Sequence, residues 1–185
     1  MRRVERKDIV SISEYEKNRT AVREKILKIK QIRRVHVGQY LTFLFENFET
    51  IKYQIQEMIR AEHMLDEQQI NHELATYNEL LGEQGELGCT LLIEIDDSAQ
   101  RAELLAKWLD LPQSLYLRTA DGQLIPPLID DRQVGEQRIS SVHYLRFRLG
   151  DKVPAAVGCR HGDLNHETLF TPEQTLELCK DALAR

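Results

Sequence analysis

The sequence has few cysteines and no long apolar segment. Its three cysteines, Cys89, Cys159 and Cys179, lie far apart and form no Cys-x-x-Cys pair. Such sparse thiols are typical of a reduced protein and not of a disulfide framework. No apolar run approaches the roughly 18 residues of a membrane span. No hydrophobic segment follows the charged N-terminus, so we expect no secretory signal, no membrane partner and a cytoplasmic location.

Motifs for several kinds of catalysis are also missing. The sequence holds no Gly-x-Ser-x-Gly, and the glycine-rich segment 82–88 lacks the Lys-Ser/Thr of a phosphate-binding loop. No Glu-x-x-His occurs, which argues against a ferritin-like di-iron site. We expect His143 on the polar side of its strand, as a surface residue and not as a base. The sequence therefore identifies no reaction.

The composition is that of a folded α+β protein. The chain has 185 residues, of which 42% are hydrophobic and 30% charged, and this length suits one domain. We expect a flexible lead-in at 1–12 and a single domain at 13–185. Helical periodicity dominates 13–86 and strand alternation dominates 87–185. The predicted fold is an N-terminal helical hairpin or three-helix unit packed with a small, mostly antiparallel β-sheet and two further helices.

The helical half is expected to contain three helices. The first begins at a serine cap, Ser11 or Ser13, and ends near Arg34. The second spans 39–64 and the third 66–81, unless the two form one continuous helix. Their apolar positions predict a shared core that contains Ile51, Ile55 and Ile59 with Leu74 or Tyr77.

The second half is expected to contain most of the strands. They are predicted at 89–95, 114–118, 123–129, 139–149 and 153–159. Helices are expected to begin at Asp97 or Ser98 and at Thr171. Pro154 favours an edge position for its strand. The inward face of the last helix is predicted to hold Leu176, Cys179 and Leu183.

Positive charge is concentrated near the N-terminus. Residues 1–40 hold twelve Lys/Arg and five Asp/Glu, whereas residues 41–86 hold two and ten. The basic arm either pairs with the acidic helices of the same chain or binds nucleic acid. We favour the internal partner, because the basic stretch lacks the interleaved aromatic residues that stack on bases.

A large part of the sequence resembles a known family. The stretch from Gly38 to Glu62 carries the likeness, which continues through Asp66-Glu67, His72-Glu73, Thr76–Leu80 and Thr90–Ile95. These segments are similar to the uncharacterised bacterial proteins called domain of unknown function 3501, with the densest likeness over 35–96. Members of that family are encoded near rubrerythrin-like and iron–sulfur oxidoreductase proteins. The resemblance therefore implies a redox or metal setting and a protein partner of that kind.

The polar face of the second helix is the first candidate site. It comprises Glu46, Tyr53, Gln54, Glu57, Arg60 and Glu62. Carboxylates on a bundle helix can bind iron, but a solvated face with local ion pairs explains them equally well. A third interpretation is a buried polar network of Glu46, Gln54, Glu57 and Arg60. Glu62 lies in line with apolar residues, so we expect it at an exposed helix end or paired with Arg33 or Arg34.

The segment after the last strand is the second candidate site. Cys159, His161, Asp163 and His166 fall within eight residues, and thiolate and imidazole suit zinc or iron. Their spacing matches no standard zinc finger. A compact polar turn, in which the Asp163 and Asn165 side chains cap backbone amides, is the alternative.

Three functions remain open at this point. The first is a small accessory or protein-interaction protein of a redox or metal-related pathway. The second is a metal-dependent oxidoreductase that uses iron or zinc. The third and weakest is a nucleic-acid-binding module that uses the basic arm. A second copy of the chain is an additional candidate partner.

Overall fold

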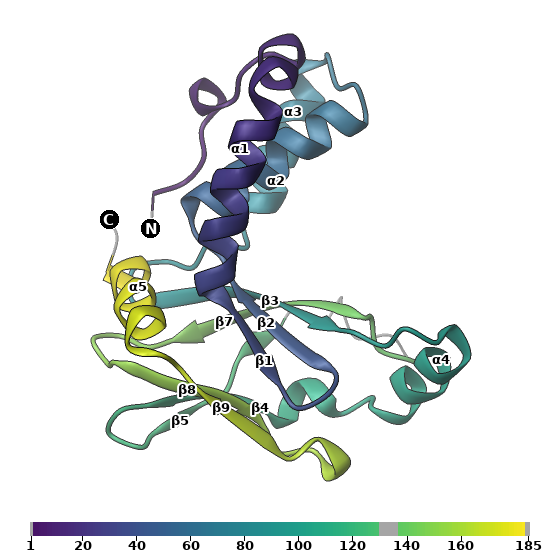
Figure 1. The fold of residues 1–185 in the computed structure, drawn as a ribbon, viewed down its shortest axis with the longest axis vertical. Helices are drawn as coiled ribbons and strands as arrows, with labels where there is room; N and C mark the ends of the chain where they lie inside the picture. The colour runs from purple at the N-terminus through teal and green to yellow at the C-terminus, as the bar shows by residue number, and fades with distance from the viewer. Residues whose placement is uncertain (1, 130–136, 184–185) are drawn as a thin grey trace.

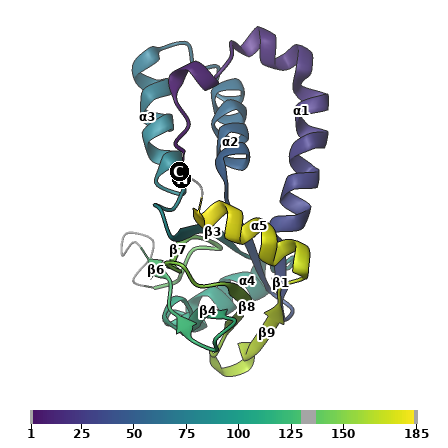
Figure 2. The ribbon, with the colours of Figure 1, turned by 90° about the vertical axis from the view of Figure 1, so that its left-hand side faces the viewer.

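The computed structural model describes residues 2–129 and 137–183, and it places a helical unit against one side of a β-rich body (Figure 1). The helical unit comes first in the chain, so the predicted α+β class and its order of elements are confirmed. Three helices lie side by side in it (Figure 2): α1 (Ile12–Arg33), α2 (Phe48–Ala61) and α3 (Glu67–Asn78). No helix of the described residues is long and apolar enough to cross a membrane.

The strands form two antiparallel sheets. The first has the order β1-β2-β3-β7-β6, with β1 (Arg34–Val37), β2 (Leu41–Phe45), β3 (Glu86–Ile93), β7 (Val142–Arg148) and β6 (Leu128–Ile129). The second has the order β5-β4-β8-β9, with β5 (Leu124–Ile125), β4 (Leu115–Thr119), β8 (Pro154–Cys159) and β9 (His166–Leu169). The other helices among the described residues are α4 (Ser98–Lys107), α5 (Pro172–Leu183) and short 3-10 turns at Arg6–Asp8, Leu111–Ser114 and Gly162–Leu164.

One hydrophobic core lies between the two sheets. It takes completely buried side chains from both, such as Phe43 and Leu91 from the first sheet and Leu117 and Val157 from the second. Thr168 of β9 donates its hydroxyl to the carbonyl of His36 in β1 (2.6 Å), which ties an edge of one sheet to an edge of the other. Burial of this apolar surface is the main force that holds the β-rich body together.

The second helix begins later than the sequence predicts, so the predicted start at residue 39 is wrong. Residues Leu41–Phe45 form β2, and the helix starts only at Phe48, after Asn47 and Thr50 complete a capping box. All five residues of β2 are buried, and a short apolar run fits a buried strand and a buried helix equally well. The break into β2, α2 and α3 also excludes a continuous helix over 39–81.

The hairpin of β1 and β2 was not predicted from the sequence. It turns at Gly38, which has a φ of +60°. A Cβ at this position would also lie 2.5 Å from the ring of His166. Both the backbone conformation and the close approach of β9 therefore require glycine here.

The core predicted for the helical unit is confirmed. Ile51, Ile55, Ile59 and Leu74 belong to one buried cluster, and Tyr77 packs against it. The predicted caps also hold at both ends of the chain, because Ser11 accepts from the Glu14 amide and Thr171 accepts from the Gln174 amide.

Two predictions for the C-terminal half are wrong. β8 lies between β4 and β9, so it is not an edge strand. Pro154 is tolerated because it is the first residue of β8. In α5 the buried side chains are Leu178, Asp181 and Ala182, whereas Leu176 and Leu183 are exposed.

The N-terminal segment is anchored where it was expected to be flexible. The buried side-chain amide of Asn78 accepts from the Val4 N–H (2.8 Å) and donates to the Val4 carbonyl (2.9 Å). Gln56 of α2 makes the same pair of bonds to Val10, both at 3.1 Å. Val4 and Ile9 join the core of the helical unit. Two amide side chains thus supply Val4 and Val10 with the backbone hydrogen bonds that a neighbouring strand would otherwise provide.

Acidic residues of the same chain neutralise part of the basic arm. Arg19 of α1 forms an ion pair with Glu57 of α2 (2.8 Å), and Lys25 lies 3.3 Å from Glu49. Arg6 pairs with Glu67 at the start of α3 (2.7 Å). These contacts are those expected of an internal partner.

A buried ion pair joins the helical unit to the C-terminal helix. Arg33, the last residue of α1, is 4% exposed. Its guanidinium donates two hydrogen bonds to Asp181 of α5 (2.9 and 3.1 Å) and a third to Glu177 (3.0 Å). Burial raises the pKa of the Asp181 carboxyl, and the hydrogen bond from Arg33 opposes that rise. The Asn47 side chain at the start of α2 also opposes it.

We expect Arg33→Ala to destabilise the protein by about 3–5 kcal/mol, because Asp181 is then left as an unpaired buried charge. Urea denaturation followed by circular dichroism measures this loss. Arg34→Ala is the control, since Arg34 is the next residue and its side chain is exposed. Equal midpoints for the two variants would contradict the assignment.

We expect Asn78→Ala to release the N-terminal segment. The substitution leaves the N–H and the carbonyl of buried Val4 without partners, at a cost of about 1–3 kcal/mol. Limited proteolysis should then cleave within the first ten residues faster than in the parent protein. Asn18→Ala on the exposed face of α1 should leave the cleavage rate unchanged, and an unchanged rate for Asn78→Ala would refute the anchor.

Candidate binding cleft

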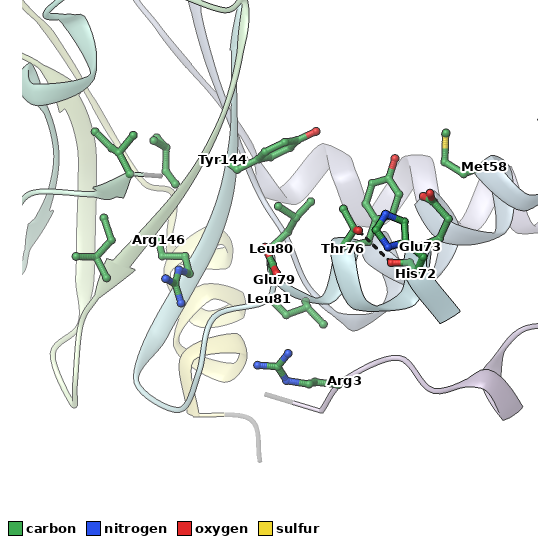
Figure 3. A pocket seen from close by; sticks show the side chains of 14 residues that line it. Arg3, Met58, His72, Glu73, Thr76, Glu79, Leu80, Leu81, Tyr144 and Arg146 are labelled. Carbon is green, nitrogen blue, oxygen red and sulfur yellow. Dashed lines mark hydrogen bonds between the residues drawn. The ribbon is translucent and has the colours of Figure 1, made fainter. Parts of the chain in front are cut away.

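A cleft lies where the helical unit meets the first sheet (Figure 3). Its volume is about 920 Å³, which is within the usual range for ligand sites. One wall is α3 with the turn that follows it, and the other is formed by β7 and β6. The N-terminal segment contributes Arg3.

Helical and strand periodicity bring the lining side chains together. His72, Glu73, Thr76 and Tyr77 recur on one face of α3, because residues three and four apart are neighbours on a helix. Tyr144 and Arg146 of β7 share the other side of the cleft, because alternate residues of a strand share a face. Figure 3 shows the Tyr144 ring extending from the sheet toward the helix. Leu80 and Leu81 add apolar surface between the two walls.

Two tyrosines, Tyr77 and Tyr144, line the cleft. Burial raises the pKa of Tyr77, the Gln54 amide opposes this rise, and the nearby Tyr144, Glu73 and Glu62 side chains add to it. The Tyr77 hydroxyl is therefore protonated at neutral pH and can donate a hydrogen bond. Tyr144 is 40% exposed, so part of its side chain faces the solvent in the cleft.

Most guanidinium N–H groups of Arg3 and Arg146 have no acceptor among the described residues. Arg146 lies 3.7 Å from Glu86, whose other carboxylate oxygen accepts from Arg148 at 2.9 Å. Burial would raise the pKa of Glu86, but the Arg148 hydrogen bond, the Glu83 amide and the Arg146 charge together lower it. Arg3 forms no ion pair with any described residue. Glu79, which also lines the cleft, adds a negative charge to these two positive ones.

A second hollow adjoins the cleft at the start of α3. Its volume is about 460 Å³, and it shares His72 and Glu73 with the cleft. The other charged residues that line it are Glu62 and Asp66. The α3 face therefore continues from one hollow into the other.

The polar helix face predicted from the sequence is divided between different surroundings. Glu57 binds α1, with Tyr15 at 2.6 Å and Arg19 at 2.8 Å. The Arg19 hydrogen bond lowers the pKa of Glu57 to about 2, although burial opposes the shift. Arg60 is the one other member of the predicted network that contacts Glu57 (3.3 Å). These residues fasten α1 to α2 and do not line the cleft.

The remaining members of that face lie apart from Glu57. Glu46 precedes α2, is buried and accepts hydrogen bonds from Thr50 and Thr90. Gln54 lies beside Tyr77, and the Tyr53 ring lies beneath the Lys30 ammonium group (5.6 Å). Glu62 is exposed at the end of α2. This is the first of the two placements expected for it, the other being a pair with Arg33 or Arg34. The predicted network of Glu46, Gln54, Glu57 and Arg60 is therefore not formed.

The second candidate site is spread over β8, β9 and the turn between them. Cys159 is completely buried, and burial raises its pKa to about 11, so the thiol is protonated at neutral pH. The His161 ring lies 3.0 Å from Asp110. Cys159 and His166 are register partners in the ladder. The side chain of Asp163 lies outside the described residues. Across the part of the chain that the structure describes, no three His, Cys, Asp or Glu residues are grouped to hold a metal ion.

The comparisons with known proteins agree with the sequence resemblance. The model of a family described as "Protein of unknown function (DUF3501)" matches residues 3–182. The chain belongs to the DUF3501 family. A crystal structure of a novel protein of unknown function from Burkholderia pseudomallei K96243 is similar, with a TM-score of 0.89 and 28% identity. The match covers 97% of this chain and 99% of that one. No curated protein matches the chain, so the family brings a fold and no assigned reaction.

His143, predicted at the surface, is instead completely buried. It shares the inward face of β7 with Leu145 and Phe147, while Tyr144, Arg146 and Arg148 face outward. Leu145, Phe147 and Leu149 lie two, four and six residues after His143, so they share its face of the strand. This alternation is the sequence signal that would have predicted a buried His143. Neither ring nitrogen has a hydrogen-bond partner among the described residues. Burial lowers the pKa of the imidazole, and the Ser140 backbone opposes only part of that shift.

We expect His143 to make the fold sensitive to acid. Below about pH 6.5 the unfolded chain binds a proton that the native imidazole resists, so stability falls by up to about 1.4 kcal/mol per pH unit. That loss stops once the pH passes below the lowered native pKa. His143→Leu should remove this slope, seen as the difference between urea midpoints at pH 7.5 and 5.5, whereas His72→Leu at an exposed position should keep it. A variant with the parental slope would rule out this role.

Proposed function

We propose that this DUF3501 protein is a non-catalytic accessory protein of the cytoplasm, which binds a partner protein in the cleft between α3 and β7. The observation that carries the proposal is the joint presence of Tyr77, Tyr144, Arg3 and Arg146 around one open cleft. Tyrosine and arginine are enriched in protein interfaces, where they supply most of the binding energy.

The surroundings of the lining residues support binding over catalysis. Thr76 donates its hydroxyl to the His72 carbonyl (3.0 Å), which is an ordinary bond within a helix. The His72 side chain is exposed. The cleft therefore offers hydrogen-bond donors, charges and apolar surface, but its polar groups are not arranged as a nucleophile with an adjacent base.

The redox or metal setting comes to the proposal from the family resemblance alone. A rubrerythrin-like or iron–sulfur protein is the partner class that the resemblance implies. The metal-dependent oxidoreductase and the nucleic-acid-binding module are the competing functions. No contact among the described residues favours the first of these, and the ion pairs of Arg6, Arg19 and Lys25 occupy part of the charge that the second would use.

Site-specific photo-crosslinking in the host cell tests the proposal. A benzophenone amino acid at position 144 should give one discrete protein adduct on irradiation, identifiable by mass spectrometry. The same amino acid at position 153 is the control, because Val153 is 45% exposed and lies outside the cleft. No adduct at position 144, or equal adducts at both positions, would contradict a partner in the cleft.

A further inference from the structure

The two hollows form one groove along the exposed face of α3. They share His72 and Glu73, so a ligand can follow the helix from its first turn to its last. The helix has 12 residues, which corresponds to about 18 Å at 1.5 Å per residue. An extended peptide of about five or six residues covers that length, at roughly 3.3 Å per residue.

The two ends of this groove carry opposite charge. Glu62 and Asp66 lie at the N-terminal end of α3, and Glu73 follows one to two turns later. None of these three carboxylates forms an ion pair within the described parts of the chain. Arg3 lies at the other end, because its neighbour Val4 is bonded to Asn78, the last residue of α3. Arg146 joins it there, and Glu79 offsets one of these two positive charges.

The middle of the groove is apolar and aromatic. Tyr77, Leu80 and Tyr144 line it between the charged ends. A ligand that fits this order has charges of opposite sign at its two ends and an apolar centre. A small compact molecule reaches one end only, whereas an extended chain reaches both.

We propose that the groove binds an extended peptide segment of a partner protein, with basic residues against Glu62, Asp66 and Glu73 and acidic residues against Arg3 and Arg146. This inference rests on the proposed function and specifies the part of the partner that is recognised. Complementary charges select this partner and fix the direction of the segment, and the tyrosines supply contact area.

Fluorescence anisotropy with labelled, terminally capped hexapeptides tests the proposal on the full chain. Two probes carry charge at the ends, Lys-Lys-Ala-Leu-Glu-Glu and its reverse. A third, Lys-Glu-Leu-Ala-Lys-Glu, has the same composition with the charges mixed. One of the first two should bind at least tenfold more tightly than the third, and salt should weaken this preference. Equal affinity for all three probes, or binding of none of them, overturns the proposal.

Matched variants locate the peptide. Arg146→Ala should weaken binding about two- to fivefold, as expected for an exposed ion pair. Arg118→Ala should have no effect, because Arg118 pairs with Glu167 in the second sheet and does not line the groove. Glu73→Gln and Glu67→Gln form the corresponding pair on α3, since Glu67 binds Arg6 outside the groove. Equal losses within either pair would place the peptide elsewhere and overturn the proposal.

The crosslinking result separates the two levels of inference. An adduct at position 144 without any preference among the peptides would retain the partner protein and reject the charged extended segment. Absence of both would reject the proposed function as well.

Discussion

The ion pair between Arg33 and Asp181 joins the helical unit to the C-terminal helix of the β-rich body at a buried point. Arg33 ends α1 and is followed directly by β1, while Asp181 lies on α5 at the other end of the chain. A buried guanidinium with a single set of partners accepts only a narrow range of positions, because loss of either partner leaves an unpaired buried charge. The pair therefore ties the end of α1 to α5, which packs against β3 and β8.

The N-terminal segment depends on a similar polar anchor. Asn78 and Gln56 satisfy the backbone of Val4 and Val10, and the segment between these contacts packs its apolar side chains into the helical core. Because Arg3 precedes the first anchor, its guanidinium is held beside the cleft instead of moving with a free terminus. Arg3 of the candidate site is thus positioned by Asn78, a residue that the sequence pattern identifies only as part of the third helix.

Elements with a long period or a strong cap were predictable from the sequence, as α1, α3, α4 and α5 show. The buried face of α2 was also predictable, because Ile51, Ile55 and Ile59 recur at the four-residue spacing of a helix. β1 and β2 were not, since Leu41–Phe45 is apolar except at Thr42, is buried at every position and shows no clear alternation. The orientation of β7 was misread at His143, where burial of a neutral imidazole runs against the usual preference of polar groups for water.

The candidate cleft could not be predicted, because its parts are far apart in the sequence. Arg3, Tyr77 and Tyr144 come from the N-terminal segment, α3 and β7, and only the folded chain brings them to one cleft. The residues with conspicuous chemistry, such as Glu57 and Cys159, instead fasten helices together or fill the core. In this fold the buried polar groups serve mainly as joints between elements. Arg3, Glu62, Asp66 and Glu73, which form no ion pair with a described residue, line the two hollows. That division is the physical reason for proposing recognition at the cleft and for attributing stability to the buried charges.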